Sequence, residues 1–287
     1  FDFKQKVAYK TEILAGLTVA MTMIPESLSF AILAGFPPLV GLYGAFIMGI
    51  ITAIFGGRPG LISGGAGATV IVLIALMKSH GLDYVFGAVA VAGIIQIIVG
   101  LLKLGKFIRL VPQPVMFGFV NGLAIIIFMS QFEQFKTVID GQTEWLSGNP
   151  LLTMTALVAL TIAIILILPK LTNAIPASLV AIVVVFAVVL LFNIDTKQVV
   201  DIAKISGDFP PFHIPQIPFT LETLNIILPY GLIMAAVGLT EGLLTLNLVD
   251  EITATKGNSN RECLAQGTAN IANGFFFGMG GCPMIAQ

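Results

Sequence analysis

Long apolar runs, separated by short polar stretches, divide the chain into segments of membrane length. An uncharged run of about 20 residues can cross roughly 30 Å of hydrocarbon as an α-helix. The first run extends from Ile13 to Gly57 with Glu26 as its single charge, and the Gly-Phe-Pro-Pro turn at residues 35–38 splits it into two spans. Further spans are expected at Tyr84–Leu102, Val111–Ser130, Leu151–Leu168, Ala174–Ile194 and Thr223–Val249. The pattern predicts an all-α polytopic membrane protein.

Two other segments are shorter and rich in glycine. Gly64–Met77 follows the Gly-Gly-Arg-Pro-Gly run of residues 56–60, and Cys263–Gln287 contains the Gly-Met-Gly-Gly run of residues 278–281. An apolar run of only about ten to fourteen residues that opens with glycines is typical of a half-helix beginning inside the membrane. We therefore expect both segments to be irregular, each with a half-helix that starts near mid-membrane.

The order of these segments indicates an inverted repeat. Seven crossings precede the loop Asp195–Glu222 when Gly64–Met77 is counted, so a following repeat must enter from the opposite side. The two halves also share a pattern, because Glu26 and Glu241 are each followed, at nearly the same distance, by a Gly-Gly pair. We predict two inverted repeats of seven segments whose half-helices meet at mid-membrane.

This arithmetic divides the chain into three parts. Residues 1–194 form the first repeat, residues 195–222 an extracellular linker, and residues 223–287 the start of the second repeat, with segments eight, nine and the beginning of ten. An N-terminus in the cytoplasm places ten of the fourteen Lys and Arg residues on that side, as the positive-inside rule requires. We expect a multi-pass protein of the inner, cytoplasmic membrane.

Composition excludes several classes of function. With 57% hydrophobic and 10% charged residues and a mean hydropathy of +1.00, the chain is not a soluble domain. A net charge of -1 without clustered Lys or Arg argues against nucleic acid as a partner. The two cysteines and two histidines make no transition-metal constellation. The expected partners are a small solute and the lipid bilayer, and a homodimer is a candidate assembly.

Three stretches carry a family resemblance: IPESLSFAILAGFPPLVGLYGAF at residues 24–46, GLLKLGKFIRLVPQPVMFGFVNGLAI at residues 100–125, and TKGNSNRECLAQGTANIANGFFFGMGG at residues 255–281. They resemble the sulfate permease (SulP) family, bacterial relatives of the solute-carrier anion transporters that include prestin and pendrin. The resemblance implies fourteen segments in two inverted repeats, a core domain, a gate domain and usually a C-terminal cytoplasmic regulatory domain. Because Gln287 falls where the tenth segment should begin, we expect a piece of a longer protein, with the regulatory domain absent from this chain.

The glycine-rich segments can form an anion site. Two facing half-helix N-termini offer unpaired N–H groups and together about one positive charge, without Lys or Arg. We expect the segments to converge, with Pro283 placed in a first helical turn. The same small residues would also permit close helix packing, and the residues alone do not decide. The resemblance favours an anion cradle made of Gly65, Ala66, Gly67, Ala68, Thr69, Gly281, Cys282, Pro283 and Met284.

Two acids lie deep within spans, where an unpaired carboxylate is costly. Glu241, with Thr245 one turn later and with Gly281, resembles the family position where an acid coordinates Na⁺ or exchanges a proton. Na⁺ is therefore a candidate coupling ion, and no cofactor is expected. The structural alternative is that Glu241 pairs with a polar neighbour such as Thr240 or Asn247.

The second acid, Glu26, stands where relatives often carry Gln at the anion site. It would then bind substrate, but it could equally be protonated or bond to backbone freed by Pro25. Phe30, one turn beyond, matches a family aromatic residue that borders the site. Gln96, which lies within a span, is expected to make an interhelical hydrogen bond rather than to bind substrate.

The function implied is secondary active transport of a small inorganic anion, sulfate or bicarbonate, coupled to Na⁺ or H⁺, as in a symporter. The alternatives are a nucleobase permease of the same fold and a passive anion channel whose flux ignores any co-ion gradient. An enzyme is not expected, because no nucleophile, metal cluster or basic phosphate pocket accompanies the acids.

Overall fold

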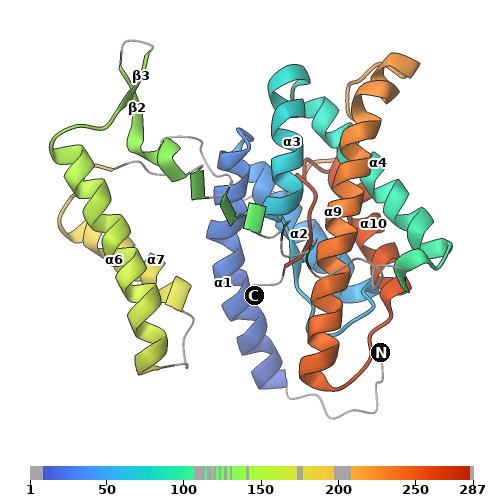
Figure 1. The fold of residues 1–287 in the computed structure, drawn as a ribbon, viewed down its shortest axis with the longest axis horizontal. Coiled ribbons are helices and arrows are strands. Elements are labelled where there is room, and N and C mark those ends of the chain that lie inside the picture. Colours follow the sequence, from blue (N-terminus) through green and yellow to red (C-terminus); the bar gives the residue numbers. More distant parts are fainter. Residues whose placement is uncertain are drawn as a thin grey trace. The chain divides into compact units, whose positions relative to one another are not determined.

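The computed structural model describes residues 9–106, 131–139, 142–172, 177–196 and 208–284, with scattered residues between 114 and 129 (Figure 1). The chain divides into two compact units. One comprises Phe1–Met23 with Ile125–Asp201, and the other Ile24–Ala124 with Ile202–Gln287. The span expected at Val111–Ser130 lies largely outside the described residues.

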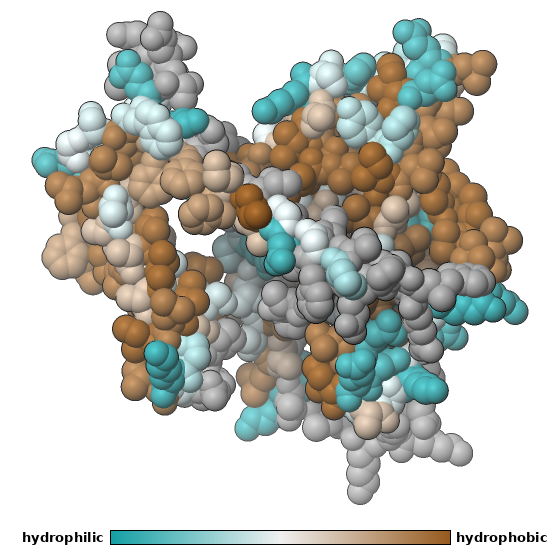
Figure 2. All heavy atoms as spheres, in the orientation of Figure 1, coloured by the Kyte–Doolittle hydropathy of each residue, from teal (hydrophilic) through white to brown (hydrophobic). Residues whose placement is uncertain are grey.

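The first unit contains the N-terminal part of α1 (Tyr9–Leu33), which passes into the second unit after Met23, and the pair α6 (Asn149–Leu171) and α7 (Ala177–Leu191). These two helices pack against each other. Most of their described side chains point outward although they are apolar, as expected of a surface that faces lipid. Figure 2 shows apolar residues over much of this unit's visible surface.

The same unit contains a β-hairpin that the apolar pattern did not predict. A 3₁₀ turn, η2 (Phe132–Phe135), leads into β2 (Lys136–Ile139), which pairs antiparallel with β3 (Gln142–Trp145) so that Lys136 faces Trp145. The Lys136 ammonium lies 5.3 Å from the centre of the Trp145 ring, a cation–π distance. An Asp-Gly pair in the sequence between the strands is a hairpin signal, but it is too short to register in a search for spans.

The second unit is a helical bundle with one short strand pair. Its elements after α1 are α2 (Pro38–Phe55), β1 (Ser63–Gly64), α3 (Gly67–His80), α4 (Leu82–Leu101), α9 (Leu221–Thr253), α10 (Ser259–Phe275) and β4 (Cys282–Pro283). Helix α10 packs against α4 and α2, and α9 packs against α4 and α3. The buried core includes Leu73, Phe86, Val89, Met234 and Met279.

Helices α4 and α10 approach closely through glycines. A Cβ atom added at Gly93 would lie 2.5 Å from the Gly267 carbonyl oxygen, and one added at Gly267 would lie 2.6 Å from the Gly93 carbonyl oxygen. Seven residues further along each helix, Gly100 and Gly274 face the partner helix in the same way. Small residues at such spacing bring helix backbones together inside a membrane.

Residues 208–220 connect to the second unit ahead of α9. The His213 N–H group donates to the Phe275 carbonyl oxygen at 2.7 Å, and its Nε2 lies 2.6 Å from an Asp83 carboxylate oxygen at the start of α4. The Thr220 hydroxyl accepts the Thr223 N–H at 3.2 Å and so caps α9. The linker predicted at 195–222 therefore ends two residues earlier, because α9 begins at Leu221.

The apolar runs located most helices correctly. Helices α1, α2, α4, α6, α7 and α9 lie where spans were expected, and within the described part of the chain five helices are long and apolar enough to cross a membrane. The expectation of an irregular segment over Cys263–Gln287 is wrong for its first half, because α10 is a regular helix of 17 residues. Its buried face is polar, so a search for apolar runs overlooks it.

Candidate anion site

The two glycine-rich segments cross each other as a short antiparallel strand pair. Ser63 of β1 faces Pro283 of β4, and Gly64 faces Cys282. The Met284 N–H group donates to the Ile62 carbonyl oxygen at 3.0 Å, and a Cβ atom on Gly281 would overlap the Gly64 carbonyl oxygen. The predicted convergence of the segments is therefore confirmed.

One arm of the site is the start of α3. Ala66 caps the helix in an extended conformation, and its carbonyl oxygen accepts from the Val70 N–H at 3.1 Å and from the Thr69 hydroxyl at 2.9 Å. The N–H groups of Gly67, Ala68 and Thr69 precede the first bond within the helix, so the helix itself does not use them. Residues 63–70 are all buried. A buried helix N-terminus of this kind attracts anions.

Phe30 borders this arm. A Cβ atom on Gly67 would lie 2.7 Å from Phe30 Cε1, so the aromatic ring lies directly against the first residue of α3. The structure thus places Phe30 against the start of α3, and its role at an anion site stays a prediction. Gly65 lies between β1 and α3, where its Cβ would overlap the Met279 methyl group.

The other arm differs from the expectation. Pro283 lies in β4, so its predicted place in a first helical turn is wrong. Strand pairing with Ser63 fixes its position, and a two-residue strand tolerates a residue that has no N–H group. The half-helix expected to follow falls on residues 285–287, outside the described residues. The roles of Cys282, Pro283 and Met284 in binding substrate stay predictions.

The backbone of Gly281 is already bonded. Its N–H donates to Asn270 Oδ1 at 2.9 Å, and its carbonyl oxygen accepts from Asn270 Nδ2 at 3.1 Å. The Gly281 N–H group is thus committed to the protein. Any donor that this arm offers to an anion must come from a later residue.

The two membrane acids lie in the same region. The Cys282 thiol donates to Glu241 Oε2 at 3.1 Å, and Glu26 lies close enough to Glu241 for the two carboxylates to interact electrostatically. Helix α9 packs directly on β4 here, because a Cβ on Gly242 would lie 2.8 Å from Pro283 Cδ. Glu241 therefore lies directly against the segment that contains β4.

Two polar neighbours of Glu241 donate their hydroxyl groups to backbone carbonyls rather than to its carboxylate. The Thr245 hydroxyl donates at 2.8 Å to the backbone carbonyl of Glu241, and the Thr240 hydroxyl donates to Ala236 O at 2.7 Å. Thr245 lies one turn from the acid, as predicted. That these residues hold a coupling ion stays a prediction.

A line of buried polar side chains on α10 escaped the sequence analysis. Glu262, Gln266 and Asn270 follow one another at four-residue intervals and are each at most 2% exposed. Such spacing puts them on one face of the helix, and it is the signal that could have revealed them. Asn270 Nδ2 also donates to Gln96 Oε1 at 2.9 Å, which confirms the interhelical hydrogen bond predicted for Gln96.

Comparison with known proteins identifies the family. The sequence matches the model of the sulfate permease family over residues 9–286. The chain belongs to this family. The sulfate permease resemblance predicted from the three sequence stretches is thus confirmed, as is a polytopic, all-α membrane fold.

Individual relatives in the sulfate permease family are longer than this chain. It is 45% identical to YbaR of Bacillus subtilis, named as a provisional sulfate transporter, over 97% of this chain and 56% of the relative. It is 34% identical to the bicarbonate transporter BicA of Picosynechococcus sp., over 94% of this chain and 51% of the relative. The chain therefore spans about half the length of the curated relatives that it matches.

Solved structures agree on the fold. The transmembrane domain of a cyanobacterium bicarbonate transporter BicA superposes with a TM-score of 0.83 at 30% identity, covering 99% of this chain and 76% of that chain. The murine Solute Carrier 26 family member A9 anion transporter, in the inward-facing state, gives a TM-score of 0.73 at 16% identity, covering 99% and 53%. The second similarity concerns the fold alone.

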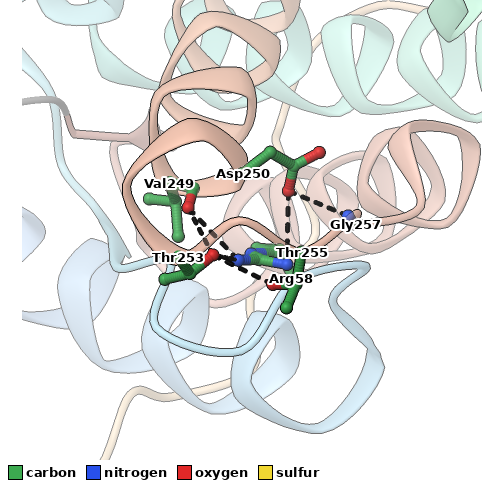
Figure 3. A network of polar contacts seen from close by, with 6 residues as sticks. All are labelled: Arg58, Val249, Asp250, Thr253, Thr255 and Gly257. Carbon is green, nitrogen blue, oxygen red and sulfur yellow. Dashed lines mark hydrogen bonds and ion pairs between the residues drawn. The ribbon is translucent and has the colours of Figure 1, made fainter.

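Arg58 of this sulfate permease chain belongs to a separate polar network (Figure 3). Its guanidinium lies 3.3 Å from an Asp250 carboxylate oxygen and donates to the Val249 carbonyl at 3.2 Å and to the Thr253 hydroxyl. The Gly257 N–H group donates to the same Asp250 oxygen at 2.8 Å. The network ties the loop after α2 to the turn after α9, and Asp250 neutralises the charge of Arg58. This cation is therefore committed to structure rather than to an anion.

Proposed function

We propose that this sulfate permease family member carries a small inorganic anion across the cytoplasmic membrane as a secondary active transporter, with no catalytic step. The observation that supports this proposal is the β1–β4 crossing, which brings the start of α3 against the segment Gly281–Met284. Sulfate and bicarbonate are the candidate substrates, since relatives are named for each of these anions.

The cradle would recognise an anion by backbone and small side chains. The N–H groups of Gly67, Ala68 and Thr69, which the helix itself does not use, lie at the helix start, where the helix dipole adds about half a positive charge. Ala66 and Ala68 are only 1% and 3% exposed, so other atoms pack closely around their methyl groups. A small oxyanion fits such a place better than a bulky organic acid does.

Coupling would depend on Glu241. A buried carboxylate is relieved equally by a proton or by Na⁺ beside it, and either would also make the neighbouring cradle less repulsive to an anion. The Glu241 carboxylate, the Thr245 hydroxyl and the Gly281 carbonyl supply the hard oxygen atoms that Na⁺ prefers. The Cys282 sulfur, which now bonds to Glu241, is a poor ligand for Na⁺. Both coupling ions stay candidates.

We extend the proposal to the architecture of the whole transporter: two inverted repeats, the N-terminus in the cytoplasm and a homodimer as the candidate assembly. The antiparallel crossing of one segment from each repeat supports the inverted arrangement.

The deciding experiment is uptake of labelled sulfate and labelled bicarbonate into proteoliposomes, with a Na⁺ gradient and an H⁺ gradient imposed separately. We expect one anion to accumulate above its equilibrium level with one of the two gradients. Flux that ignores both gradients would identify a passive channel instead. Uptake of a labelled nucleobase, with neither anion transported, would favour the nucleobase permease and refute the proposal.

A further inference from the structure

The α10 polar face contacts both strands of the crossing, one turn apart. Gln266 Nε2 donates to the Ser63 hydroxyl of β1 at 2.7 Å, and Asn270 bonds to both backbone groups of Gly281, just before β4. Through these bonds, α10 links Ser63 to Gly281, which are far apart in the sequence. A single helix face therefore holds the two segments that make up the proposed cradle.

Each of the two carboxamides is itself oriented by a neighbour. Gln266 Nε2 also donates to Glu262 Oε1 at 2.8 Å, and Glu262 Oε2 in turn accepts the Gly57 N–H at 2.8 Å. Asn270 Nδ2 also donates to Gln96 Oε1 at 2.9 Å. Both hydrogens of each NH₂ group are therefore used, which leaves each carboxamide one orientation. The four donated bonds therefore favour a single arrangement of the pair, while Gln266 Oε1 and Gln96 Nε2 have no hydrogen-bond partner within the described residues.

The side-chain amide of Asn270 bonds both backbone groups of Gly281, as a neighbouring β-strand would. The amide donates to the carbonyl and accepts from the N–H of one residue, so both backbone torsions of Gly281 are restrained. Gly280, at a φ of +70°, leaves room for this contact, because a Cβ there would lie 2.9 Å from Asn270 Oδ1. A residue with a side chain at position 280 would disturb the bond as well as strain the backbone.

We infer that Asn270 and Gln266 are positioning residues of the anion cradle, which set the crossing of β1 and β4 without touching the anion. The inference rests on the proposed function for its meaning in transport. Its geometric part, the restraint of Gly281 by Asn270, is measurable without any transport. Gln96 and Glu262 act one step further out by orienting the two carboxamides.

The chain offers a matched control. Asn273 lies on the same face of α10, is also fully buried, and its side-chain polar atoms have no hydrogen-bond partner within the described residues. Asn270→Ala and Asn273→Ala thus remove the same group from the same helix, but only the first releases a strand. Cys282, next to Gly281 and fully buried, serves as the reporter in a Cys263→Ala background, which leaves it the one cysteine of this sequence.

The experiment measures how fast a water-soluble maleimide modifies Cys282, together with the KM for sulfate and bicarbonate uptake. We expect Asn270→Ala to raise the modification rate by about tenfold or more, because two hydrogen bonds to Gly281 are lost. The KM for the transported anion should rise as well. Asn273→Ala should change neither value by more than about twofold, because it removes no hydrogen bond to Gly281.

A second variant covers the case in which Asn270→Ala fails to fold. Asn270→Asp keeps the size and the acceptor for the Gly281 N–H but loses both donated bonds, and should give an intermediate modification rate. An unchanged rate in the folded Asn270 variants, or an equal rise in Asn273→Ala, would overturn the inference. Failure of the parent protein to take up any anion would refute the proposed function alone, since the modification assay needs no transport.

Discussion

At the scale of single residues, the site combines groups that attract an anion with groups that repel it. The start of α3 offers N–H groups, whereas Glu241, which interacts electrostatically with Glu26, contacts Cys282 of the crossing strand. An anion and two ionised carboxylates cannot share a small buried space cheaply. In the proposed transport cycle, charge on the acids would therefore have to be compensated when the anion binds, and this would link co-ion and substrate.

Substitution of Glu241 by Gln tests that link. Gln imitates the protonated state permanently, so the variant should still bind anion but should lose the accumulation that a co-ion gradient drives. The measurement is anion uptake with and without the gradient. Glu222→Gln, which changes an exposed acid in the first turn of the same helix, should leave coupling intact.

Two results would count against Glu241 as the coupling residue. A folded Glu241→Gln protein that concentrates anion with full dependence on the gradient would make Glu26 the next candidate. A misfolded or poorly inserted protein would indicate a structural role, with the bond from Cys282 as its basis.

The close packing around Ala66 and Ala68 gives a second prediction. Ala66→Leu or Ala68→Leu should obstruct the start of α3 and reduce uptake to the background of empty vesicles, because both positions are buried. Ala75→Leu, at an exposed position on α3, is the matched control and should transport normally. Normal uptake by a correctly inserted Ala66→Leu or Ala68→Leu protein would move the anion site away from α3.

The sequence pointed to the glycines and acids of the candidate site, but not to the residues that hold them in place. Gly65, Gly281 and Glu241 stand out because glycine runs and lone charges are conspicuous in an apolar chain. Asn270 does not, because its role depends on Gln96, 174 positions away, and on the bend of the chain at Gly280. A polar residue on a helix gives no sign in the sequence of which backbone group it will meet.

At the scale of elements, lipid determines which helices the sequence reveals. Helices such as α6 and α9 need long apolar runs because their outer faces are exposed to hydrocarbon, so the runs predict them. Helix α10 is surrounded by α2, α4 and α9 and turns a polar face inward, so it has no such run. Its existence follows from packing rather than from its own composition.

The glycine contact between α4 and α10 predicts a measurable cost. Gly267→Ala should destabilise the folded protein by about 1–3 kcal/mol, because the new methyl group meets a backbone carbonyl that cannot move aside. The measurement is the thermal unfolding midpoint in detergent. Gly49→Ala in α2 has open space around its Cβ and should leave the midpoint unchanged or slightly higher.

Two results would contradict the expected destabilisation by Gly267→Ala. Equal midpoints for the Gly267→Ala protein and the parent would mean that α4 and α10 are further apart in the membrane than in the structure. A lowered midpoint in both variants would point to a general intolerance of substitution in the bundle rather than to this contact.

At the scale of the whole molecule, the described chain consists of two units that use apolar surface in different ways. In the second unit, apolar side chains fill a core around Phe86 and Met234, and polar groups gather at the strand crossing. In the first unit, helix α6 has only Leu157 buried among its residues. Membrane helices with so little internal packing depend on lipid, or on other protein, for their contacts.

The orientation of the chain in the membrane can be tested at two exposed positions. With the N-terminus in the cytoplasm, Ser79→Cys in the last turn of α3 should react with a membrane-impermeant maleimide on intact cells. Lys256→Cys, in the turn after α9, should react only after the cells are permeabilised. Both positions are exposed, and the two native cysteines are buried, which keeps the background low. The reverse pattern would invert the topology.

The strand crossing also has a consequence for biosynthesis. Ser63 pairs with Pro283, so the first strand leaves the ribosome about 220 residues before its partner. At about 5–20 residues per second, this gap is on the order of 10 to 40 seconds. During that time the backbone of residues 63–64 lacks its strand partner in a setting where unsatisfied N–H and C=O groups are costly. The nascent chain must therefore keep this segment hydrated, or sheltered by the insertion machinery, until Cys282 and Pro283 have been synthesised.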